Sequence, residues 1–242
     1  MLLKCCLNGP RLPAEHPALP VTSAQLAADA AAVVAAGAGA VHLHAKDDQG
    51  RDTLAAGPVA AALRAVRRAV PATPVGMTTG AWASPDPTAR RDAVAVWTEL
   101  PDFASVNWHE DGADEVAGAL LDLGVGVEAG LWHEEAVARW ASSPHRDRCL
   151  RVLLELPDGP DPEQARALAT GLVAAVRALG PHPPLLLHGL GSSTWPALEL
   201  AGELGLDTRV GLEDTLALPD GSAADGNAAL VAAALAVLGP TA

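Results

Sequence analysis

The chain has 242 residues, half of them hydrophobic, and a formal net charge of -13 at pH 7. This length suits one large α/β domain, and the negative charge argues against nucleic acid and anionic membranes, which attract basic faces. The three cysteines form no CxxC pair, so we expect free thiols and a cytoplasmic location. Neither a membrane span nor a cleavable leader is recognisable in the sequence.

Short apolar runs alternate with longer alanine- and leucine-rich segments along the whole chain. In chain order, the expected pairs of strand and helix are 3–7 with 22–36, 40–45 with 55–69, 74–78 with 87–100, 103–108 with 114–123, 126–131 with 134–141, 149–156 with 162–179, 184–189 with 195–204, and 208–213 with 223–238. Thr22 and Asp86 are placed to cap two of these helices, and Gly37 is placed to end one. An unbroken series of β/α units predicts a parallel sheet.

Closure of this sheet into a single barrel domain over residues 1–242 is the favoured architecture. A (β/α)8 barrel takes about 250 residues, whereas an open doubly wound sheet usually carries a glycine-rich phosphate loop. No such loop is complete in this sequence. The sequence therefore predicts a (β/α)8 TIM barrel with its functional residues at the carboxyl ends of the strands.

Two histidines end the second expected strand, and an arginine and a glutamate end the eighth. Residues two apart on a strand point to the same side, so His42 and His44 project together, as do Arg209, Gly211 and Glu213. Alternate strands feed the same interior layer of a barrel, so Glu213 can meet the histidines. Two histidines and one glutamate are a known catalytic zinc set. The alternatives are ordinary core or surface histidines and a structural Arg–Glu pair.

Further polar residues lie at the ends of the middle strands. Ser105 and Asn107 share one face of the fourth strand, and Thr79 and Gly80 follow the third. Hydroxyl and amide groups of this kind suit a substrate carboxylate or carbonyl. Glu128 lies between two glycines on the fifth strand, which gives an inward carboxylate space.

Several segments of the chain resemble one family of enzymes. These segments are LKCCLNGPR, AVHLHAKDDQGRDTL, TTG, FASVNWHE, VEAGLW and TRVGLEDT. They are similar to the beta-keto acid cleavage enzymes, also called 3-keto-5-aminohexanoate cleavage proteins. The resemblance implies a zinc-bearing barrel, usually a homo-oligomer (a dimer or a tetramer), that condenses a beta-keto acid with acetyl-CoA. Cleavage of the product would give acetoacetate and a new acyl-CoA.

The resemblance also implies roles for single residues. His42, His44 and Glu213 would hold zinc or another divalent metal. Asp214 would swing over the mouth of the barrel and take a proton from the carbon between carboxylate and ketone, and Arg209 would orient it. Beside zinc and a guanidinium, the pKa of Asp214 is expected to be lowered.

The substrate would be bound by the polar strand ends. Thr79, Gly80, Ser105 and Asn107 would bind the carboxylate and carbonyl of the keto acid, and Glu128 would be a further polar residue of the pocket.

The chain also departs from the pattern of this family. Arg11 stands near the position at which the best-known family members carry an acidic residue, which resembles a group that binds a cationic substrate tail. Arg11 therefore predicts a neutral or anionic tail. Asp207 stands where members often carry histidine.

Other functions remain open on the sequence alone. A metal-dependent hydrolase of the amidohydrolase type would need more histidines on the middle strands. A Schiff-base aldolase would have to use Lys4 or Lys46, the only lysines. A non-enzymatic barrel would lack either the base or a metal ligand. Glu155 is as consistent with a rim position as with an inward one, and His188 is interpreted as a structural histidine.

Overall fold

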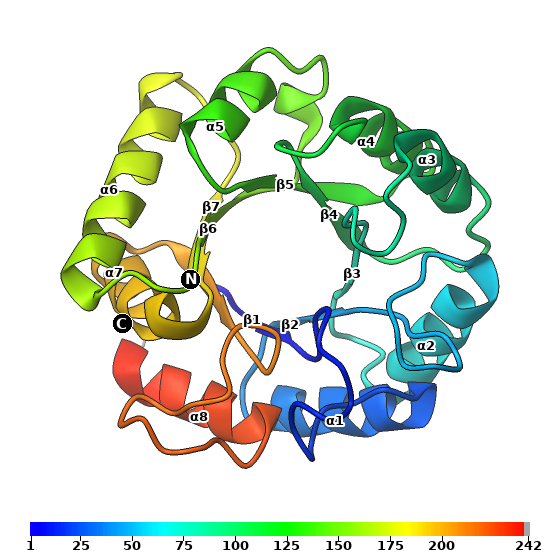
Figure 1. Ribbon diagram of the computed structural model, residues 1–242, viewed down its shortest axis with the longest axis horizontal. Helices are drawn as coiled ribbons and strands as arrows, with labels where there is room; N and C mark the ends of the chain where they lie inside the picture. The colour runs from blue at the N-terminus through cyan, green and yellow to red at the C-terminus, as the bar shows by residue number, and fades with distance from the viewer. Residues whose placement is uncertain (240–242) are drawn as a thin grey trace.

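Eight parallel strands close into a barrel in the computed structural model, which describes residues 1–239 (Figure 1). The strands are β1 (Leu3–Cys6), β2 (Ala40–Leu43), β3 (Val75–Thr78), β4 (Phe103–Asn107), β5 (Gly126–Leu131), β6 (Arg151–Leu156), β7 (Leu185–Gly189) and β8 (Asp207–Val210). The helices are α1 (Ser23–Ala35), α2 (Ala56–Ala69), α3 (Pro87–Ala95), α4 (Ala113–Asp122), α5 (Glu134–Ala141), α6 (Pro162–Ala178), α7 (Thr194–Leu204) and α8 (Asn227–Leu238), with short 3-10 turns at Arg146–Arg148 and Gly191–Ser193. The predicted TIM barrel is confirmed.

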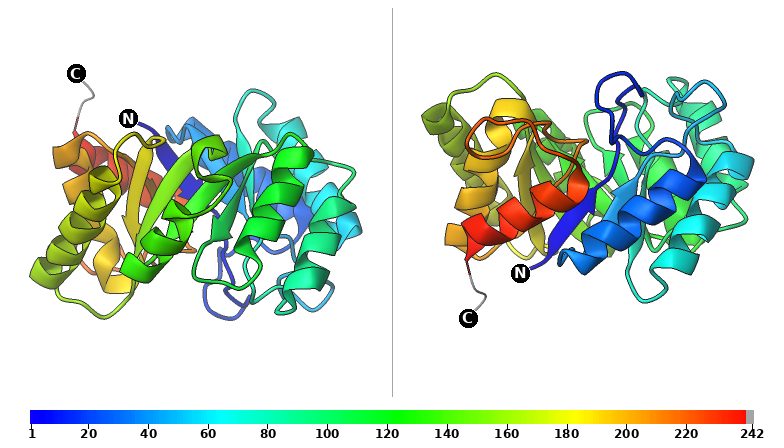
Figure 2. Two further views of the ribbon diagram at one scale, coloured as in Figure 1. Left: turned by 90° about the horizontal axis from the view of Figure 1, so that it is seen from above. Right: turned by 90° about the horizontal axis from the view of Figure 1, so that it is seen from below.

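The helices form a ring around the strands, and Figure 2 shows the same arrangement from the side. Each strand pairs in parallel with the next, and β8 closes the ring against β1. Both faces of the strands are therefore buried, which explains their nearly continuous apolar runs. Within residues 1–239, no helix is long and apolar enough to cross a membrane.

Helix caps follow the residues expected from the sequence. Thr22 caps α1 in a reciprocal capping box with Gln25, and Asp86 accepts the backbone N–H of Ala89 at the start of α3. Helix α3 ends at Ala95, earlier than expected. Beyond its end, the indole of Trp97 is buried in the core and donates to the backbone carbonyl of Leu54, just before α2.

Strands β2 and β8 end two and three residues earlier than expected, and both lead into the mouth of the barrel. Strand β2 ends at Leu43, so His44 lies just beyond it. Strand β8 ends at Val210, and a turn follows in which the carbonyl of Gly211 accepts the N–H of Asp214 at 2.9 Å. Gly211 lies against β1, where a Cβ atom would be 1.9 Å from the carbonyl oxygen of Cys6. The chain must therefore turn at this contact, and Glu213 lies in the turn.

The amino-terminal half of the barrel is filled by a buried ionic network. Lys4 Nζ lies 2.5 Å from Glu128, and Arg151 lies 2.7 Å from the other oxygen of the same carboxylate. Arg151 also lies 3.4 Å from Asp207. The ring of Phe103 packs over the Lys4 ammonium group at 5.3 Å. This network forms a closed floor beneath the functional residues.

Candidate metal centre and active-site cavity

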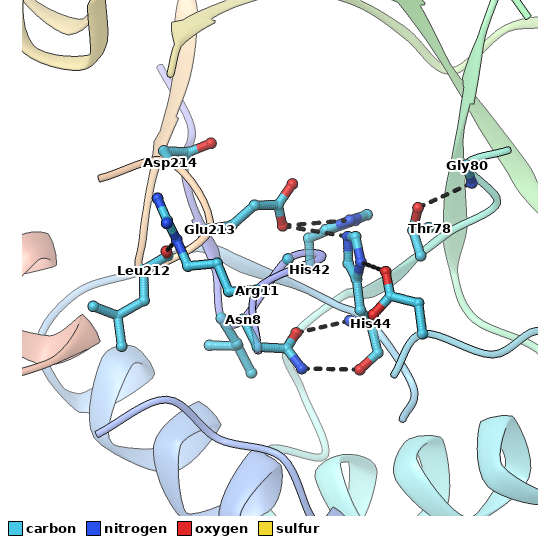
Figure 3. A network of polar contacts seen from close by, with 12 residues as sticks. Asn8, Arg11, His42, His44, Thr78, Gly80, Leu212, Glu213 and Asp214 are labelled. Carbon is cyan, nitrogen blue, oxygen red and sulfur yellow. Dashed lines mark hydrogen bonds and ion pairs between the residues drawn. The ribbon is translucent and has the colours of Figure 1, made fainter. Parts of the chain in front are cut away.

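Three side chains from β2 and the turn after β8 converge at the mouth of the barrel (Figure 3). Ligand atoms of His42, His44 and Glu213 all lie within 4.8 Å of one another. Glu213 Oε2 lies 3.5 Å from His44 Nε2 and 3.9 Å from His42 Nε2. Neither His44 Nε2 nor Glu213 Oε2 has a hydrogen-bond partner among the described residues. Because buried polar atoms are normally paired, these orphaned atoms fit a divalent metal bound by two imidazoles and a carboxylate.

Asp52 holds His44 in the orientation that a metal ligand needs. Asp52 accepts hydrogen bonds from His44 Nδ1 at 2.6 Å, Lys46 Nζ at 2.6 Å and Trp82 Nε1 at 2.8 Å. A proton on Nδ1 leaves the lone pair of Nε2 directed at the other two ligands. Burial opposes the charge on Asp52, but His44 and Lys46 outweigh it and lower the pKa of this carboxyl.

The loop after β1 holds the backbone around the candidate metal ligands. The Asn8 side chain donates to the carbonyl of His44 and accepts its N–H, both at 2.9 Å. This side chain replaces the strand pairing that ends at Leu43. Gly9 has a φ of +56°, and a Cβ atom there would lie 2.5 Å from Glu213 Cγ. The backbone of Gly9 thus packs directly against the Glu213 side chain.

Arg209 joins the two acidic residues that follow β8. Its guanidinium lies 3.0 Å from Glu213 Oε1 and 2.7 Å from Asp214 Oδ1. Burial raises the pKa of both acids. For Glu213, Arg209 and the two histidines reverse this effect and lower the pKa. For Asp214, burial and the charge of Glu213 outweigh Arg209, so its pKa is raised. The lowered pKa expected from the sequence applies to a carboxylate beside a bound zinc ion as well as Arg209, and it stays a prediction.

Burial also governs the histidine charge state. It lowers the pKa of His42 well below its usual range, which favours the neutral ring that a metal requires.

A small cavity lies over the ligand set. Its volume is about 160 Å³, below the range of roughly 300–1,000 Å³ typical of drug-sized ligand sites. It is lined by Pro10, His42, His44, Thr78, Trp82, Ser105, Asn107, Trp132, Leu153, Glu155, Leu190, Arg209 and Glu213. The predicted residues Ser105, Asn107 and Arg209 are therefore brought together with the candidate ligands.

Strand β3 contributes a different threonine from the one predicted. Thr78 lines the cavity, whereas the hydroxyl of Thr79 donates to the carbonyl of Ser105 at 2.7 Å. The N–H of Gly80 donates to Thr78 Oγ1 at 3.1 Å, so Gly80 orients Thr78 and does not line the cavity itself. The alternation of side chains along the strand could have identified Thr78, which shares a face with Gly76.

Three other predicted residues lie away from the cavity. Glu128 is fully buried in the ionic floor, so the structure corrects its placement in the pocket. The Arg11 guanidinium donates to the carbonyl of Leu212 and to Glu15, and it is not among the lining residues. Asp214 is completely buried beside Arg209, in the turn after β8, and is not among the lining residues.

Two residues that the sequence left without a role lie beside the site. Glu155 lines the cavity from β6, so its inward alternative is the one observed. His188 on β7 lies 3.4 Å from Glu155 and 3.9 Å from Asp214. Both ring nitrogens of His188 lack hydrogen-bond partners among the described residues, so it is not the satisfied structural histidine that was expected. No sequence pattern indicated this contact between neighbouring strands.

The barrel is similar to several solved structures. The apo structure of ObcA matches with a TM-score of 0.71 and 21% identity, over 89% of this chain and 61% of ObcA. The ternary complex of ObcA with a C4-CoA adduct and oxalate matches with a TM-score of 0.72 and 22% identity, over 89% and 62% of the two chains. A type I 3-dehydroquinate dehydratase from Clostridium difficile matches with a TM-score of 0.66 and 11% identity, over 98% and 90%. These likenesses support the fold, and the chain spans about three fifths of ObcA.

The sequence itself gives the more specific relationship. No curated protein matches the chain. The sequence model of the beta-keto acid cleavage enzymes matches residues 1–240, which is nearly the entire length. This match agrees with the resemblance carried by the HLH and RVGLED segments, which contain the three converging ligands. The chain belongs to the beta-keto acid cleavage enzyme family.

Proposed function

We propose that this protein is a zinc-dependent enzyme that converts a beta-keto acid and acetyl-CoA into acetoacetate and a new acyl-CoA. One C–C bond forms between the acetyl carbon and the CH₂ group of the keto acid, and the bond from that CH₂ group to the original ketone carbon breaks. The CoA sulfur passes from the acetyl group to the released acyl group, so the reaction balances without an oxidant or reductant. The observation that carries this proposal is the set of orphaned ligand atoms on His44 and Glu213, beside His42, in a member of this family.

The metal would be held by His42, His44 and Glu213, with Asp52 fixing the ring of His44. When bound, a divalent metal acts as a Lewis acid that polarises a ketone oxygen. Zinc is proposed because two histidines and one glutamate are a recurring catalytic zinc set.

The carboxylate of the keto acid would lie on the side of β3 and β4. Thr78 Oγ1 already accepts the N–H of Gly80, so its O–H is free to donate. The hydroxyl of Ser105 forms no hydrogen bond within the described residues, and Asn107 lies next to it in the lining. In our proposal Thr78 binds the substrate carboxylate, the role first given to Thr79 and Gly80. Gly80 donates to the Thr78 hydroxyl, and Thr79 is bonded to the backbone of Ser105. A solved complex of ObcA contains oxaloacetate, itself a beta-keto acid, and another contains a CoA adduct, which agrees with these two substrate classes.

Asp214 is our candidate for the base. Arg209 holds one of its oxygens at 2.7 Å, while Oδ2 is buried and has no partner among the described residues. The raised pKa of this carboxyl makes it a stronger base than an exposed aspartate. Arg209 acts as a positioning residue for Asp214 and lines the cavity itself. Asp214→Asn should abolish turnover and leave the metal content intact, whereas retained turnover would exclude Asp214 as the base.

The decisive experiment combines metal analysis with a substrate screen. Purified protein should contain close to one zinc ion per chain and should form acetoacetate from acetyl-CoA and at least one beta-keto acid. His42→Ala and His44→Ala should lose both the metal and the activity, while His182→Ala, in the loop before β7, should lose neither. Metal-free protein that gains no activity with zinc, manganese or cobalt would contradict the proposal.

The rival enzymatic functions find less support in the structure. Amidohydrolase-type sites need further histidines, and β5 and β6 carry none. Lys4 and Lys46 are both engaged in buried ion pairs, and neither lines the cavity, so no lysine is placed to form a Schiff base.

Two properties of the molecule stay proposals on sequence grounds alone. We propose a homo-oligomer, as the family implies, which light scattering would test. We also propose a cytoplasmic location, based on the few unpaired cysteines.

A further inference from the structure

The wall of the cavity opposite the ligand set is apolar except for the Glu155 carboxyl group and the indole N–H of Trp132, which has no hydrogen-bond partner among the described residues. Trp132, Leu153 and Leu190 line this wall from the ends of β5, β6 and β7, and Glu155 lies among them on β6. An apolar wall suits the methylene groups of a substrate tail. One acid within it would contact only a polar group at a defined position on that tail.

Glu155 lacks the partners that a buried acid normally has. It is 7% exposed, and it forms no hydrogen bond with another described residue. Its ion-pair contact is with His188 Nε2 at 3.4 Å, and that nitrogen has no hydrogen-bond partner among the described residues. Because native structures rarely leave such groups unsatisfied, the pair points to a ligand that supplies the missing hydrogen bonds.

The charges around Glu155 favour a neutral partner. Arg209 lines the same cavity and would repel a cation, yet it is occupied by Glu213 and Asp214 and has little capacity left for an anion. Burial raises the pKa of Glu155 to about 8, so the isolated group holds its proton near neutral pH. A protonated carboxyl both donates and accepts, as a hydroxyl does. Pairing two neutral groups also avoids the cost of desolvating two charges.

We propose that Glu155, backed by His188, is a specificity-determining residue that selects beta-keto acids with a short tail ending in a hydroxyl group. This inference rests on the proposed function. With the ketone beside His42, His44 and Glu213 and the carboxylate beside Thr78 and Ser105, the tail leads toward the wall that carries Glu155. The cavity volume of about 160 Å³ limits that tail to a few atoms.

The test compares three beta-keto acids with two-carbon tails that end in a hydroxyl, a methyl or an ammonium group. Binding of each to zinc-loaded protein is measured by calorimetry without acetyl-CoA, and turnover is measured separately with acetyl-CoA. Wild-type protein should bind the hydroxyl compound about 10-fold more tightly than either analogue, as one added hydrogen bond allows. Glu155→Gln should keep this preference, because the amide also donates and accepts. Glu155→Leu should lose it.

Glu163→Leu, on the exposed first turn of α6, is the matched control and should behave as wild type. Equal binding of the hydroxyl and methyl compounds by wild-type protein would overturn the inference without any variant, as would tighter binding of the ammonium compound. Tail selectivity in binding without turnover of any compound would reject only the proposed reaction. Failure to bind any of the three compounds would reject both proposals.

Discussion

The variant Gly9→Ala tests whether the loop after β1 fixes the position of Glu213. Gly9 has a φ of +56°, and a Cβ atom on it would lie 2.5 Å from Glu213 Cγ. This distance is about 0.9 Å shorter than the 3.4 Å at which ordinary contact begins. The variant therefore combines a strained backbone with a displacement of Glu213, the proposed metal ligand, and these two effects can be measured separately.

Gly205→Ala isolates the backbone effect. Gly205 ends α7 with a φ of +65°, and a Cβ atom there would meet nothing within 4 Å. A left-handed conformation costs a residue with a side chain about 1–2 kcal/mol. At roughly 2–4 °C per kcal/mol for a chain of this size, both variants should lower the melting temperature by about 2–8 °C.

Only Gly9→Ala should weaken metal binding. Because it shifts Glu213 away from the histidines, we expect its zinc affinity to fall at least about 10-fold, as for changes to residues that orient ligands. Competition with a chromophoric chelator measures this affinity in both variants. If Gly9→Ala binds zinc as tightly as Gly205→Ala, the contact between Gly9 and Glu213 does not position the ligand and our reasoning is wrong.

Three further predictions concern other parts of the molecule. Asp52→Asn removes the carboxylate that orients His44, so zinc affinity in chelator competition should fall about 10–100-fold, and an unchanged affinity would contradict this role. Glu128→Leu leaves the Lys4 ammonium buried without its partner, so denaturant unfolding should show a loss of about 3–5 kcal/mol with unchanged zinc content; a loss of substrate affinity alone would instead return Glu128 to the pocket. Burial raises the pKa of Asp29 to about 6, so as pH rises from about 4 to 6 the unfolded chain releases this proton first and stability falls. Asp29→Asn should therefore raise the melting temperature at pH 7.5 and not at pH 4, and an equal change at both values would refute the assignment.

The barrel and the ligand set were predictable because each depends on a short-range pattern. Alternation along one strand places His42 and His44 on the same side. Alternate strands of a barrel contribute side chains to the same interior layer, which places these histidines at the level of Glu213. These rules need only the position of a residue within its strand. They gave the right neighbours although β2 and β8 both end before His44 and Glu213. After β8, the turn at Gly211, and not further strand alternation, brings Glu213 to the histidines.

The residues that support the ligands could not be predicted in the same way. Asn8 and His44 are 36 positions apart, and their contact depends on how the loop after β1 crosses the end of β2. Asp52 lies in a loop with no periodic pattern, and it meets His44 only because an isolated bridge pairs Lys46 with Asp52. Alternation within a strand carries no information about such loops.

Arg11 shows the limit of carrying a role over from a position in a family's sequence pattern. It was assigned to the substrate tail because it stands near the position of an acidic residue that, in the family, would bind a cationic tail. The structure brings Pro10 to the cavity lining but directs Arg11 to the carbonyl of Leu212. The preference for a neutral or anionic tail therefore has no support from Arg11, and the contacts of Glu155 now provide the basis for predicting the tail.

Gly211 illustrates how one close contact organises the whole site. The sequence placed this glycine on the same face of the strand as Arg209 and Glu213. The structure shows that a Cβ atom would collide with the backbone of Cys6, so the glycine lets the end of β8 lie directly against β1. The turn that begins there sends Glu213 to the histidines and buries the adjacent Asp214 beside Arg209. Two neighbouring carboxylates thus acquire different environments and opposite pKa shifts, which suits the proposed division between metal ligand and base.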